Sequence, residues 1–417
     1  MVTRQQIGVI GGGQLAWMMA IAAKRLGLHL TVQTANPGDS AITVADRVIY
    51  GKVADKIATA QLAEHCQVIT FENEFVDLVA LQELLDHQVD RQLLFLPKLE
   101  TLAISVDKLN QRQHFRDHHI PTPEFYSVET ETELLAAATN LSYPLVLKAR
   151  RHGYDGKGTW VIANEVELQS AWETMHKASA IAEKFIPFES ELAVIAARSE
   201  SGAISIYPVV ETLQTNQVCR RTVAPARIAP SIREQVETIA TQIVTTLDAI
   251  GVFGIEFFLT ASGEISVNEI APRTHNSGHY TIEGCRTSQF EQLLRVVSGM
   301  DLGDVAMVAN VAVMVNLLGY EKATWTCSDK SIEYSRYAEK LKAIANFPNT
   351  HIHWYNKTSS SVGRKLGHVT ILAESHDLAI DLSDRIESIW YGNKNPKESC
   401  VATRRYSVWG LGSDISN

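Results

Sequence analysis

Residues 267–279 read Val-Asn-Glu-Ile-Ala-Pro-Arg-Thr-His-Asn-Ser-Gly-His. An apolar strand pattern ends in an amide and a carboxylate, and further charged or hydrogen-bonding side chains follow within ten residues. Buried polar groups are costly unless each one finds a partner. A place where a metal ion, phosphates and a small anion meet would supply such partners, so the stretch predicts one wall of an active site.

The bulk composition narrows the class of protein. At 417 residues the chain exceeds one compact core, so two or three domains are expected. A formal net charge of −9 argues against a nucleic-acid surface, and no apolar run approaches the roughly 20 residues that span a bilayer. Five scattered cysteines without Cys-x-x-Cys spacing favour free thiols in a reducing compartment. We therefore expect a cytoplasmic protein without a nucleic-acid or membrane partner.

Residues 1–98 alternate short apolar strands with helical patterns, which predicts βαβ units around a parallel sheet. A helix over residues 105–118 is expected to follow. Residues 99–303 predict an α+β domain instead, and residues 304–417 a small β-rich one. The strands expected in these parts are 7–10, 30–34, 68–71, 93–96, 143–149, 160–163, 181–186, 192–198, 203–210, 252–259, 264–270, 308–317, 351–355 and 369–373, and the helices are 14–26, 78–85, 166–176 and 232–250.

A glycine-rich loop follows the first predicted strand. Gly11-Gly12-Gly13-Gln14-Leu15-Ala16 fits the Gly-x-Gly-x-x-Gly/Ala fingerprint of dinucleotide-binding proteins. The second strand ends in Thr34-Ala35-Asn36-Pro37, however, without the acidic residue that holds a ribose hydroxyl. Dinucleotide binding is therefore disfavoured, while a tight structural turn and binding of another ligand both stay open.

A second glycine-rich loop, residues 152–159, lies between two predicted strands of the middle domain. Successive backbone N–H groups in such a loop can surround an anion. Lys148 lies just before it in an apolar strand, where a lysine is costly unless it meets a carboxylate or a phosphate. An edge lysine reaching solvent is the alternative, but loop and lysine together favour a nucleotide-phosphate site. The loop lacks the Gly-Lys-Ser/Thr of a Walker A motif.

Two glutamates lie on the strands of a predicted hairpin. If a four-residue turn closes it, Glu256 faces Val267, and Glu269 becomes its diagonal neighbour on the same face. Two carboxylates placed in this way can bind Mg²⁺. Asn268 would point to the other face of a regular strand, so its participation requires an irregular backbone. The alternative is one exposed glutamate on each strand of a surface hairpin.

The polar segment after this hairpin allows a zinc site or an anion site. His275 and His279 have a permissive spacing for zinc, but Asn276-Ser277-Gly278 is a poor helix and no third ligand motif stands nearby. An anion site is therefore favoured.

A basic turn occurs near the C-terminus. Residues 357–368 combine glycines and hydroxyls with Lys357, Arg364 and Lys365. Such a turn can grip a phosphomonoester through an arginine fork and a lysine point charge, with a solvated hairpin as the alternative.

In this order the motifs resemble those of the ATP-grasp superfamily and, within it, the 5-(carboxyamino)imidazole ribonucleotide synthase family. The resemblance runs from Ile7 to about His368 and includes the segments 11–15, 153–158, 268–273 and 275–279. It implies an ATP-grasp fold with a Rossmann-like N-terminal domain, a mobile lid subdomain at about 122–190 and a small C-terminal domain. It also implies ATP and Mg²⁺ as cofactors, and carboxylation of aminoimidazole ribonucleotide by bicarbonate through carboxyphosphate, in purine biosynthesis.

The resemblance further implies roles for individual residues. The ATP contacts implied are Lys108, Lys148, Gly153, Tyr154, Asp155, Gly156, Lys157, Gly158, Thr159, Glu183, Lys184, Phe185, Ile186, Glu191, Gln214, Asn268 and Glu269. Glu256 and Glu269 are the implied Mg²⁺ ligands. The implied catalytic residues, for bicarbonate and its phosphorylated form, are Arg273, His275, Asn276, Asp155 and Lys157. The implied contacts to the ribonucleotide are Gln14, Leu15, Glu72, Lys357, Arg364 and Lys365.

Three other functions compete with this reading. Another ATP-grasp carboxylate–amine ligase is disfavoured by the pair His275 and His279 after Arg273. A non-catalytic nucleotide-binding regulator is disfavoured because the metal carboxylates and Lys148 are all present. An NAD(P)-dependent oxidoreductase is disfavoured by the missing acid after the second strand. Relatives in the resembled family suggest a homodimer and a hand-off of product to a separate mutase.

Overall fold

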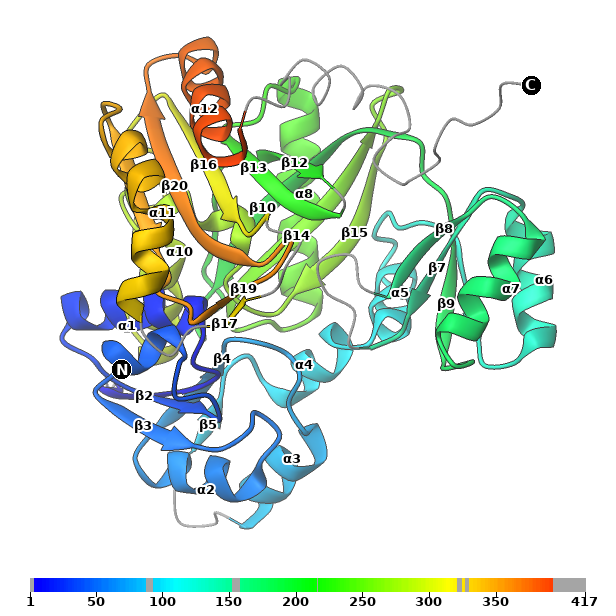
Figure 1. Ribbon diagram of the computed structural model, residues 1–417. Coiled ribbons are helices and arrows are strands. Elements are labelled where there is room, and N and C mark those ends of the chain that lie inside the picture. Colours follow the sequence, from blue (N-terminus) through cyan, green and yellow to red (C-terminus); the bar gives the residue numbers. More distant parts are fainter. Residues whose placement is uncertain are drawn as a thin grey trace.

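The computed structural model describes residues 4–87, 93–151, 158–215, 217–320, 325–326 and 330–392. The N-terminal part is a five-stranded parallel sheet in the order β3-β2-β1-β4-β5, with helices on both sides (Figure 1). This confirms the predicted α/β fold. Its elements are β1 (Gln6–Ile10), α1 (Gln14–Leu26), β2 (His29–Thr34), β3 (Arg47–Tyr50), α2 (Lys56–Glu64), β4 (Val68–Phe71), α3 (Leu78–His87) and β5 (Leu94–Phe95).

The strand order reverses between β1 and β4, and this switch point positions the site. In open parallel sheets, ligands bind beyond the carboxyl ends of the strands where the order reverses. The glycine loop follows β1 and Glu72 follows β4. Both therefore lie at the edge of the sheet where a ligand is expected.

The predicted helix over 105–118 is wrong in its first part. The structure has two helices, α4 (Leu99–Ser105) and α5 (Lys108–Asp117), because Asp107 is extended and its carboxylate accepts hydrogen bonds from the N–H groups of Leu109 and Asn110. An aspartate that caps a helix in this way starts a new one. The break gives Lys108 the first position of α5.

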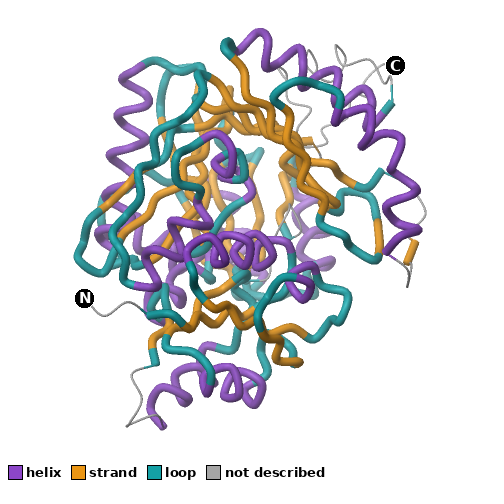
Figure 2. Tube along the Cα trace, turned by 90° about the vertical axis from the view of Figure 1, so that its left-hand side faces the viewer, coloured by secondary structure: helices purple, strands orange, loops and turns teal. Residues whose placement is uncertain are grey.

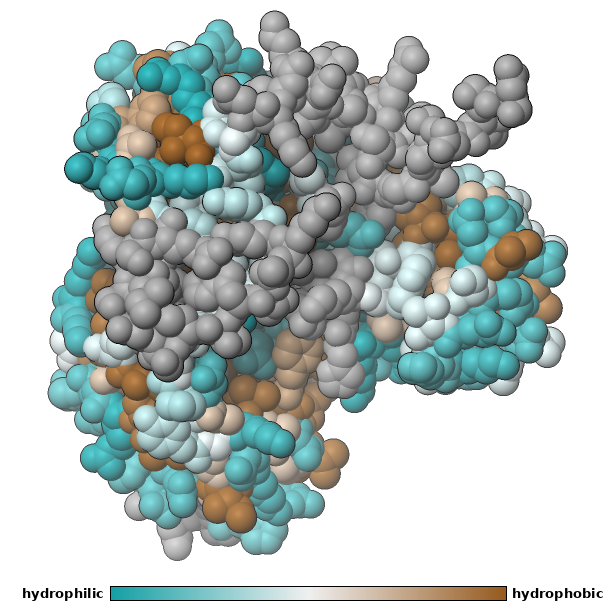
Figure 3. All heavy atoms as spheres, viewed as in Figure 1, coloured by the Kyte–Doolittle hydropathy of each residue, from teal (hydrophilic) through white to brown (hydrophobic). Residues whose placement is uncertain are grey.

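A separate four-stranded sheet, here called the lid sheet, has the order β6-β9-β7-β8 (Figure 1, right). Its apolar core is formed by its own residues, among them Val128, Leu147 and Trp172. The side of this part that faces the viewer in Figure 3 is mostly hydrophilic, with some hydrophobic residues among the polar ones. Its elements are β6 (Phe125–Val128), α6 (Glu131–Leu141), β7 (Leu145–Ala149), β8 (Thr159–Ile162), α7 (Glu165–Thr174) and β9 (Ala180–Lys184).

The largest sheet has nine strands in the order β15-β14-β10-β12-β13-β16-β20-β18, with β11 paired to β10 (Figures 1 and 2). The predicted strand 203–210 is wrong, because β11 and β12 are separated at residues 207–209. The strands are β10 (Phe188–Arg198), β11 (Ile204–Ile206), β12 (Val210–Thr215), β13 (Val218–Ala224), β14 (Gly251–Thr260), β15 (Ile265–Ala271), β16 (Val311–Leu318), β18 (Thr350–Trp354) and β20 (Lys365–Ala373). The C-terminal strands β16, β18 and β20 thus extend the sheet of the middle region.

Helices cover this sheet and join it to the N-terminal part. One apolar core contains Val9 of β1, Met19 of α1, Ile195 of β10 and Leu294 of α10. The N-terminal part and the large sheet therefore share a core, unlike the lid sheet. The remaining elements are α8 (Pro230–Thr246), the short turn η2 (Asn276–Gly278), α9 (Thr281–Gly284), α10 (Gln289–Ser298), α11 (Lys330–Ala345), α12 (His376–Tyr391) and the strand pair β17 (Trp325–Thr326) and β19 (Ser359–Ser360).

Candidate active site

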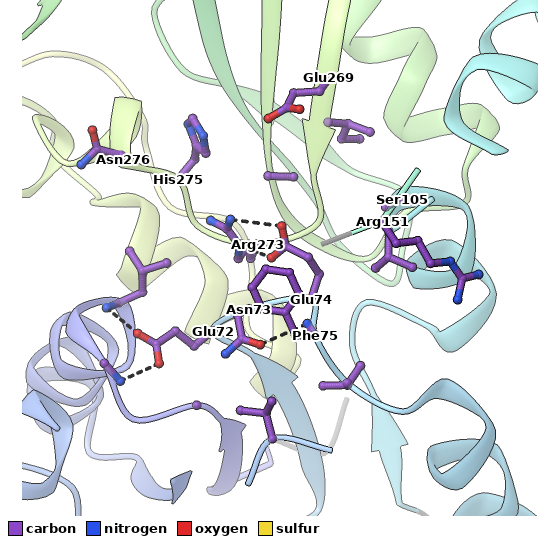
Figure 4. A pocket seen from close by; sticks show the side chains of 18 of the residues that line it. Glu72, Asn73, Glu74, Phe75, Ser105, Arg151, Glu269, Arg273, His275 and Asn276 are labelled. Carbon is purple, nitrogen blue, oxygen red and sulfur yellow. Dashed lines mark hydrogen bonds and ion pairs between the residues drawn. The ribbon is translucent and has the colours of Figure 1, made fainter. Parts of the chain in front are cut away.

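A cavity of about 650 Å³ lies where the N-terminal part, α5 and the large sheet meet. Figure 4 shows Glu72 and Glu74 approaching it from the N-terminal part, opposite Glu269, Arg273 and His275. Of the predicted site residues, those that line it are Gln14, Leu15, Glu72, Lys108, Thr159, Glu191, Gln214, Glu256, Asn268, Glu269, Arg273, His275, Asn276 and Lys365. The structure therefore brings together most of the residues that the sequence singled out.

The glycine loop after β1 binds a protein carboxylate. Glu72 accepts hydrogen bonds from the N–H groups of Gly13 (2.6 Å), Leu15 (3.0 Å) and Ala16 (3.4 Å) at the start of α1. A Cβ atom on Gly11 or Gly13 would lie 2.6 Å from the Glu72 carboxylate, so glycine is required at both positions. Because Glu72 already occupies the anion site of this helix N-terminus, the geometry disfavours a dinucleotide phosphate there.

The two metal-ligand candidates face each other directly. Glu256 pairs with Glu269, and the register shifts between Glu256 and Phe257, which pairs with Val267. The expectation that Glu256 faces Val267 is therefore wrong. Asn268 is the extra residue of this bulge, and its Nδ2 donates to Glu256 Oε2 at 3.3 Å. A β-bulge re-aims side chains, which supplies the irregular backbone that a role for Asn268 requires.

A third carboxylate adds to this concentration of negative charge. Burial, together with repulsion from Glu256 and Glu269, raises the pKa of Glu191 to about 8. Burial and the charge of Glu269 likewise raise the pKa of Glu256. Carboxylates that resist ionisation together fit a site completed by a divalent cation. In the described part of the chain, no three His, Cys, Asp or Glu side chains form a ready-made metal site, but Mg²⁺ usually takes one or two carboxylates plus substrate phosphates.

Lysines balance part of this charge. Lys108 Nζ lies 2.6 Å from Glu269 Oε2. Burial alone would raise the pKa of Glu269, but Lys108 outweighs it and the pKa falls. Lys148 is 6% exposed, and its Nζ lies 2.7 Å from Glu183 Oε2 and 3.2 Å from Asn268 Oδ1. The lysine in the apolar strand therefore meets a carboxylate, as its position required.

Arg112 fixes this network from the other side. Its Nε lies 2.7 Å from Glu183 Oε1, and its Nη2 donates to the carbonyl of Asn268 at 2.5 Å. Arg112 and Asn268 belong to α5 and β15, whereas Lys148 and Glu183 belong to the lid sheet. Charged and polar contacts therefore connect the lid sheet with the large sheet at the place where Glu256 and Glu269 face each other.

The polar segment after β15 is held from the N-terminal part. Arg273 forms a two-pronged ion pair with Glu74, whose oxygens lie 2.7 Å from Nε and 3.3 Å from Nη2 (Figure 4). His275 Nδ1 accepts from the N–H of Ser277 at 3.4 Å, and its Nε2 faces Glu256 Oε1 at 3.5 Å. A Cβ atom on Gly254 would lie 2.4 Å from that of His275, so the close approach of this segment requires the glycine.

Asn276 is committed to another amide. Its Nδ2 donates to Asn316 Oδ1 at 3.0 Å, and its Oδ1 accepts from Asn316 Nδ2 at 2.7 Å. This leaves one N–H of Asn276 to meet a ligand.

Several predicted site residues do not line the cavity, and others fall outside the residues that the structure describes. Arg364 donates to Ser359 Oγ, and Lys357 is half-buried near Tyr355, where loss of solvent lowers its pKa to about 7. Neither of them lines the cavity, in contrast to Lys365. The N–H of Lys184 donates to the carbonyl of Glu124, while Gly158 accepts from the N–H of Ala149. Phe185 and Ile186 follow β9 without lining the cavity, and Gly153, Tyr154, Asp155, Gly156 and Lys157 fall outside the described residues.

The sequence did not single out four residues that organise the site: Glu74, Asp107, Arg112 and Asn316. Asp107 holds Arg150 at 2.9 Å and Arg151 at 3.1 Å, just before the second glycine loop. Only Asp107 had a local signal, since an aspartate before a helical stretch is a cap. The others find partners far along the chain, so no local pattern marks them.

The fold and the carboxylate–lysine site define the class: an ATP-grasp enzyme. Family models match residues 4–105 (ribonucleotide synthetase preATP-grasp domain), 113–290 (ATP-grasp domain) and 312–381 (phosphoribosylaminoimidazole carboxylase C-terminal domain). The chain is 48% identical to the N5-carboxyaminoimidazole ribonucleotide synthase of Synechococcus elongatus, covering 93% of this chain and 95% of the relative. The chain therefore belongs to the N5-carboxyaminoimidazole ribonucleotide synthase family.

Solved structures agree with this membership. An N5-carboxyaminoimidazole ribonucleotide synthetase in complex with ADP matches with a TM-score of 0.84 at 32% identity, covering 95% of this chain and 99% of that one. The Aspergillus clavatus synthase, solved with ADP and 5-aminoimidazole ribonucleotide, matches with a TM-score of 0.81 at 31% identity, covering 92% and 99%. Separately, none of the helices in the described residues is both long and apolar enough to cross a bilayer.

We expect Mg²⁺ to bind this site more tightly at pH 8 than at pH 6. Because the pKa values of Glu191 and Glu256 are raised, binding must displace protons, and each proton released changes the affinity by about tenfold per pH unit. Between pH 4.5 and 8 these two carboxyl groups hold more protons in the folded chain than in the unfolded one, so their contribution to metal-free stability falls as pH rises. Titration calorimetry in two buffers of different ionisation enthalpy measures the release. A pH-independent affinity would contradict the expectation.

Proposed function

We propose that this chain carboxylates 5-aminoimidazole ribonucleotide with bicarbonate at the expense of ATP, as a ligase of purine biosynthesis. The observation that carries the proposal is the facing pair Glu256 and Glu269, flanked by Lys108 and Lys148. The polar segment with Arg273 and His275 follows directly along the chain. A phosphate-and-metal site thus lies next to a site for a small anion, which is what phosphorylation of bicarbonate requires.

The reaction runs in two steps. A bicarbonate oxygen attacks the γ-phosphorus of ATP, the bond to the β-phosphate oxygen breaks, and carboxyphosphate and ADP form. The exocyclic amine of the ribonucleotide then attacks the carboxyl carbon, or CO₂ released from it, and phosphate leaves while the nitrogen loses a proton. Positioning and charge neutralisation dominate such phosphoryl transfers, so no side chain has to act as a covalent nucleophile.

In the first step, Lys108 and Lys148 position the phosphates of ATP. Glu256 and Glu269 hold Mg²⁺, which when bound supplies charge neutralisation at the transferred phosphate. Arg273, His275 and Asn276 hold bicarbonate and then carboxyphosphate. Support comes from the ion pair with Glu74, which fixes the Arg273 guanidinium at the cavity wall.

The ribonucleotide lies on the side of the N-terminal part in this proposal. Gln14, Leu15 and Glu72 line the cavity there, and Lys365 of β20 lines the same cavity, which supports their assignment as substrate contacts. Lys357, Arg364, Asp155 and Lys157 complete the proposed set. The role proposed for the segment 153–159, most of which falls outside the described residues, is to exclude water from the labile intermediate.

The proposal divides the chain into three domains, residues 1–98, 99–303 and 304–417, and places a lid subdomain at about 122–190. It further includes a homodimer in the cytoplasm. The product carries a labile N-carboxylate, which favours its direct transfer to a separate mutase. Light scattering of the purified chain, alone and with such a mutase, tests both associations.

Release of ADP by the purified chain tests the function. We expect turnover that requires bicarbonate and is stimulated by 5-aminoimidazole ribonucleotide, but not by formate or amino acids in their place. A chain that releases no ADP with the ribonucleotide and bicarbonate, yet binds ATP, would instead be a nucleotide-binding regulator. Stimulation by another carboxylate would identify a different ATP-grasp ligase.

We expect Glu74→Gln to raise the KM for bicarbonate by about tenfold while changing the KM for ATP little. The substitution removes the charge that orients Arg273. We expect the hydrogen bond from Arg273 to bicarbonate to weaken by about 1.5 kcal/mol, which corresponds to the tenfold change in KM. Burial alone would raise the pKa of Glu74, but Arg273 outweighs it and the pKa falls, so the carboxylate is ionised when it binds the guanidinium. Initial rates at varied bicarbonate and at varied ATP separate the two effects. Equal changes in both KM values would contradict the assignment of Arg273 to bicarbonate.

A further inference from the structure

One buried group at the cavity is not used by the mechanism above. His279 follows η2, is 0% exposed and yet contributes to the cavity wall. Its Nε2 has no hydrogen-bond partner among the described residues. An unpaired buried donor or acceptor is costly, so such an atom in a native site calls for a partner from outside the protein.

The protonation of the His279 ring follows from its neighbour Gln289. Gln289 Oε1 accepts from the N–H of His275 at 2.9 Å, and its Nε2 donates to the carbonyl of His275 at 2.7 Å. These two bonds fix the orientation of the amide. The same Nε2 lies 3.2 Å from His279 Nδ1. Because Nε2 of Gln289 has only hydrogens to offer, His279 Nδ1 must accept and the ring proton resides on Nε2.

The backbone is built around this contact. A Cβ atom on Gly278 would lie 2.6 Å from Gln289 Oε1 and 2.7 Å from Ile195 Cγ1, both too close. The N–H of Gln289 donates to Thr281 Oγ1, which in turn donates to the carbonyl of Gly278. The glycine between Ser277 and His279 is therefore needed for Gln289 to reach both histidines.

The surroundings keep the ring neutral. Burial, followed by the positive charges of Lys365, His275, His353 and Arg273, holds the pKa of His279 well below its usual range. The ring also contacts Phe290 and His368, with centroids at 5.6 and 4.9 Å. His279 thus presents a neutral N–H donor near the cationic side chains of Lys365 and Arg273.

We propose that His279 donates a hydrogen bond through Nε2–H to the bicarbonate-derived oxyanion held beside Arg273 and His275. The proposal rests on the assignment of that anion to this segment. A neutral donor orients the anion without adding charge, while the cations around it supply the attraction. His279 is thereby a binding residue of the carboxylation reaction, and Gln289 is the positioning residue that sets its tautomer.

Three variants of the full-length chain test the proposal by kinetics. We expect His279→Phe to raise the KM for bicarbonate roughly tenfold to a hundredfold, as for loss of one hydrogen bond to a charged group, with the KM for ATP nearly unchanged. His279→Gln retains an N–H donor and should recover part of the loss. His368→Phe is the matched control, since it alters the adjacent ring and should leave the KM for bicarbonate unchanged.

A nitrogen NMR spectrum of histidine-labelled chain tests the tautomer without any turnover. We expect His279, assigned by its absence from the His279→Phe spectrum, to carry its proton on Nε2. In Gln289→Glu the carboxylate demands a proton on Nδ1. If the ring stays neutral, Nε2 has lost its proton and the KM for bicarbonate should rise as in His279→Phe. If the spectrum instead shows a charged ring, Nε2 keeps its proton and the KM for bicarbonate should not rise.

Three results would overturn the proposal: a proton on Nδ1 in the unsubstituted chain, equal rises in the KM for ATP and bicarbonate, or an effect of His368→Phe as large as that of His279→Phe. The last would mean that a water bridge to His368, whose Nε2 is also unpaired in the described structure, satisfies the donor. If the proposed function itself were wrong, the result would be different: the ribonucleotide would not stimulate ADP release, while the His279 ring proton would still be found on Nε2.

Discussion

Glu256→Gln is expected to lower Mg²⁺-dependent ADP release by about a thousandfold. Glu256 faces Glu269 across the hairpin. In the proposed mechanism a metal ion held by both stabilises the transferred phosphate by several kcal/mol, of which about 4 kcal/mol corresponds to this factor. Glutamine retains an oxygen that accepts from Asn268 Nδ2, so the bulge keeps its hydrogen bond. Steady-state rates at varied Mg²⁺ measure the effect.

The same substitution should stabilise the metal-free fold. At pH 8 the Glu256 carboxylate is held close to the charges of Glu269 and Glu191, and the neutral amide relieves that repulsion. A higher Tm without Mg²⁺, together with a smaller rise of Tm on adding Mg²⁺, would therefore accompany the loss of activity. Glu264→Gln is the matched control, because Glu264 is exposed at the turn of the same hairpin. If Glu256→Gln kept full activity, Glu256 could not be a required ligand of the metal ion.

Lys148→Met is the second substitution with a large expected effect. The ammonium lies between Glu183 Oε2 and Asn268 Oδ1. In the proposed mechanism it is a charge that the lid sheet contributes to the phosphates. Methionine keeps much of the aliphatic volume and removes the charge. We expect kcat/KM for ATP to fall by at least about a hundredfold, since charge-assisted hydrogen bonds contribute up to roughly 3 kcal/mol.

The stability of this variant separates a lost contact from a damaged fold. Glu183 keeps Arg112 as a partner at 2.7 Å, so the free energy of unfolding should fall by only about 1–3 kcal/mol. Adding Glu183→Gln to Lys148→Met should lower stability further and not restore activity, because the buried Arg112 guanidinium then loses its ion-pair partner. Lys177→Met, at an exposed lysine after α7, is the control. Recovery of activity in the double variant would show that Lys148 serves only to neutralise Glu183, and that the reaction does not need its charge at the phosphates.

Local sequence patterns predicted much of the architecture. The parallel order of the first sheet follows from apolar strands alternating with helical stretches, and α1 spans the residues expected for it. Lys148 was marked by its apolar strand, and Glu256 and Glu269 by their place in a hairpin. These signals are local because burial alternates along a strand with period two and along a helix with period 3.6.

The register of the hairpin could not be predicted in the same way. A bulge at Asn268 shifts every later pairing, and the contacts that stabilise it come from Arg112 and Lys148, which lie on other elements. The break between α4 and α5 was missed for a different reason, since the signal of Asp107 is local but competes with a continuous helical pattern.

The sequence by itself determined which chemical groups the site contains: paired carboxylates, a buried lysine, an arginine and two histidines after a strand. Only the tertiary structure decided how they are used. Glu74 reaches Arg273 across 199 residues, Arg112 reaches Glu183 across 71 and Asn276 reaches Asn316 across 40. The charge state of Glu256 depends on Glu269, the direction of Arg273 on Glu74 and the tautomer of His279 on Gln289, because ionisation and hydrogen bonding respond to neighbours in space.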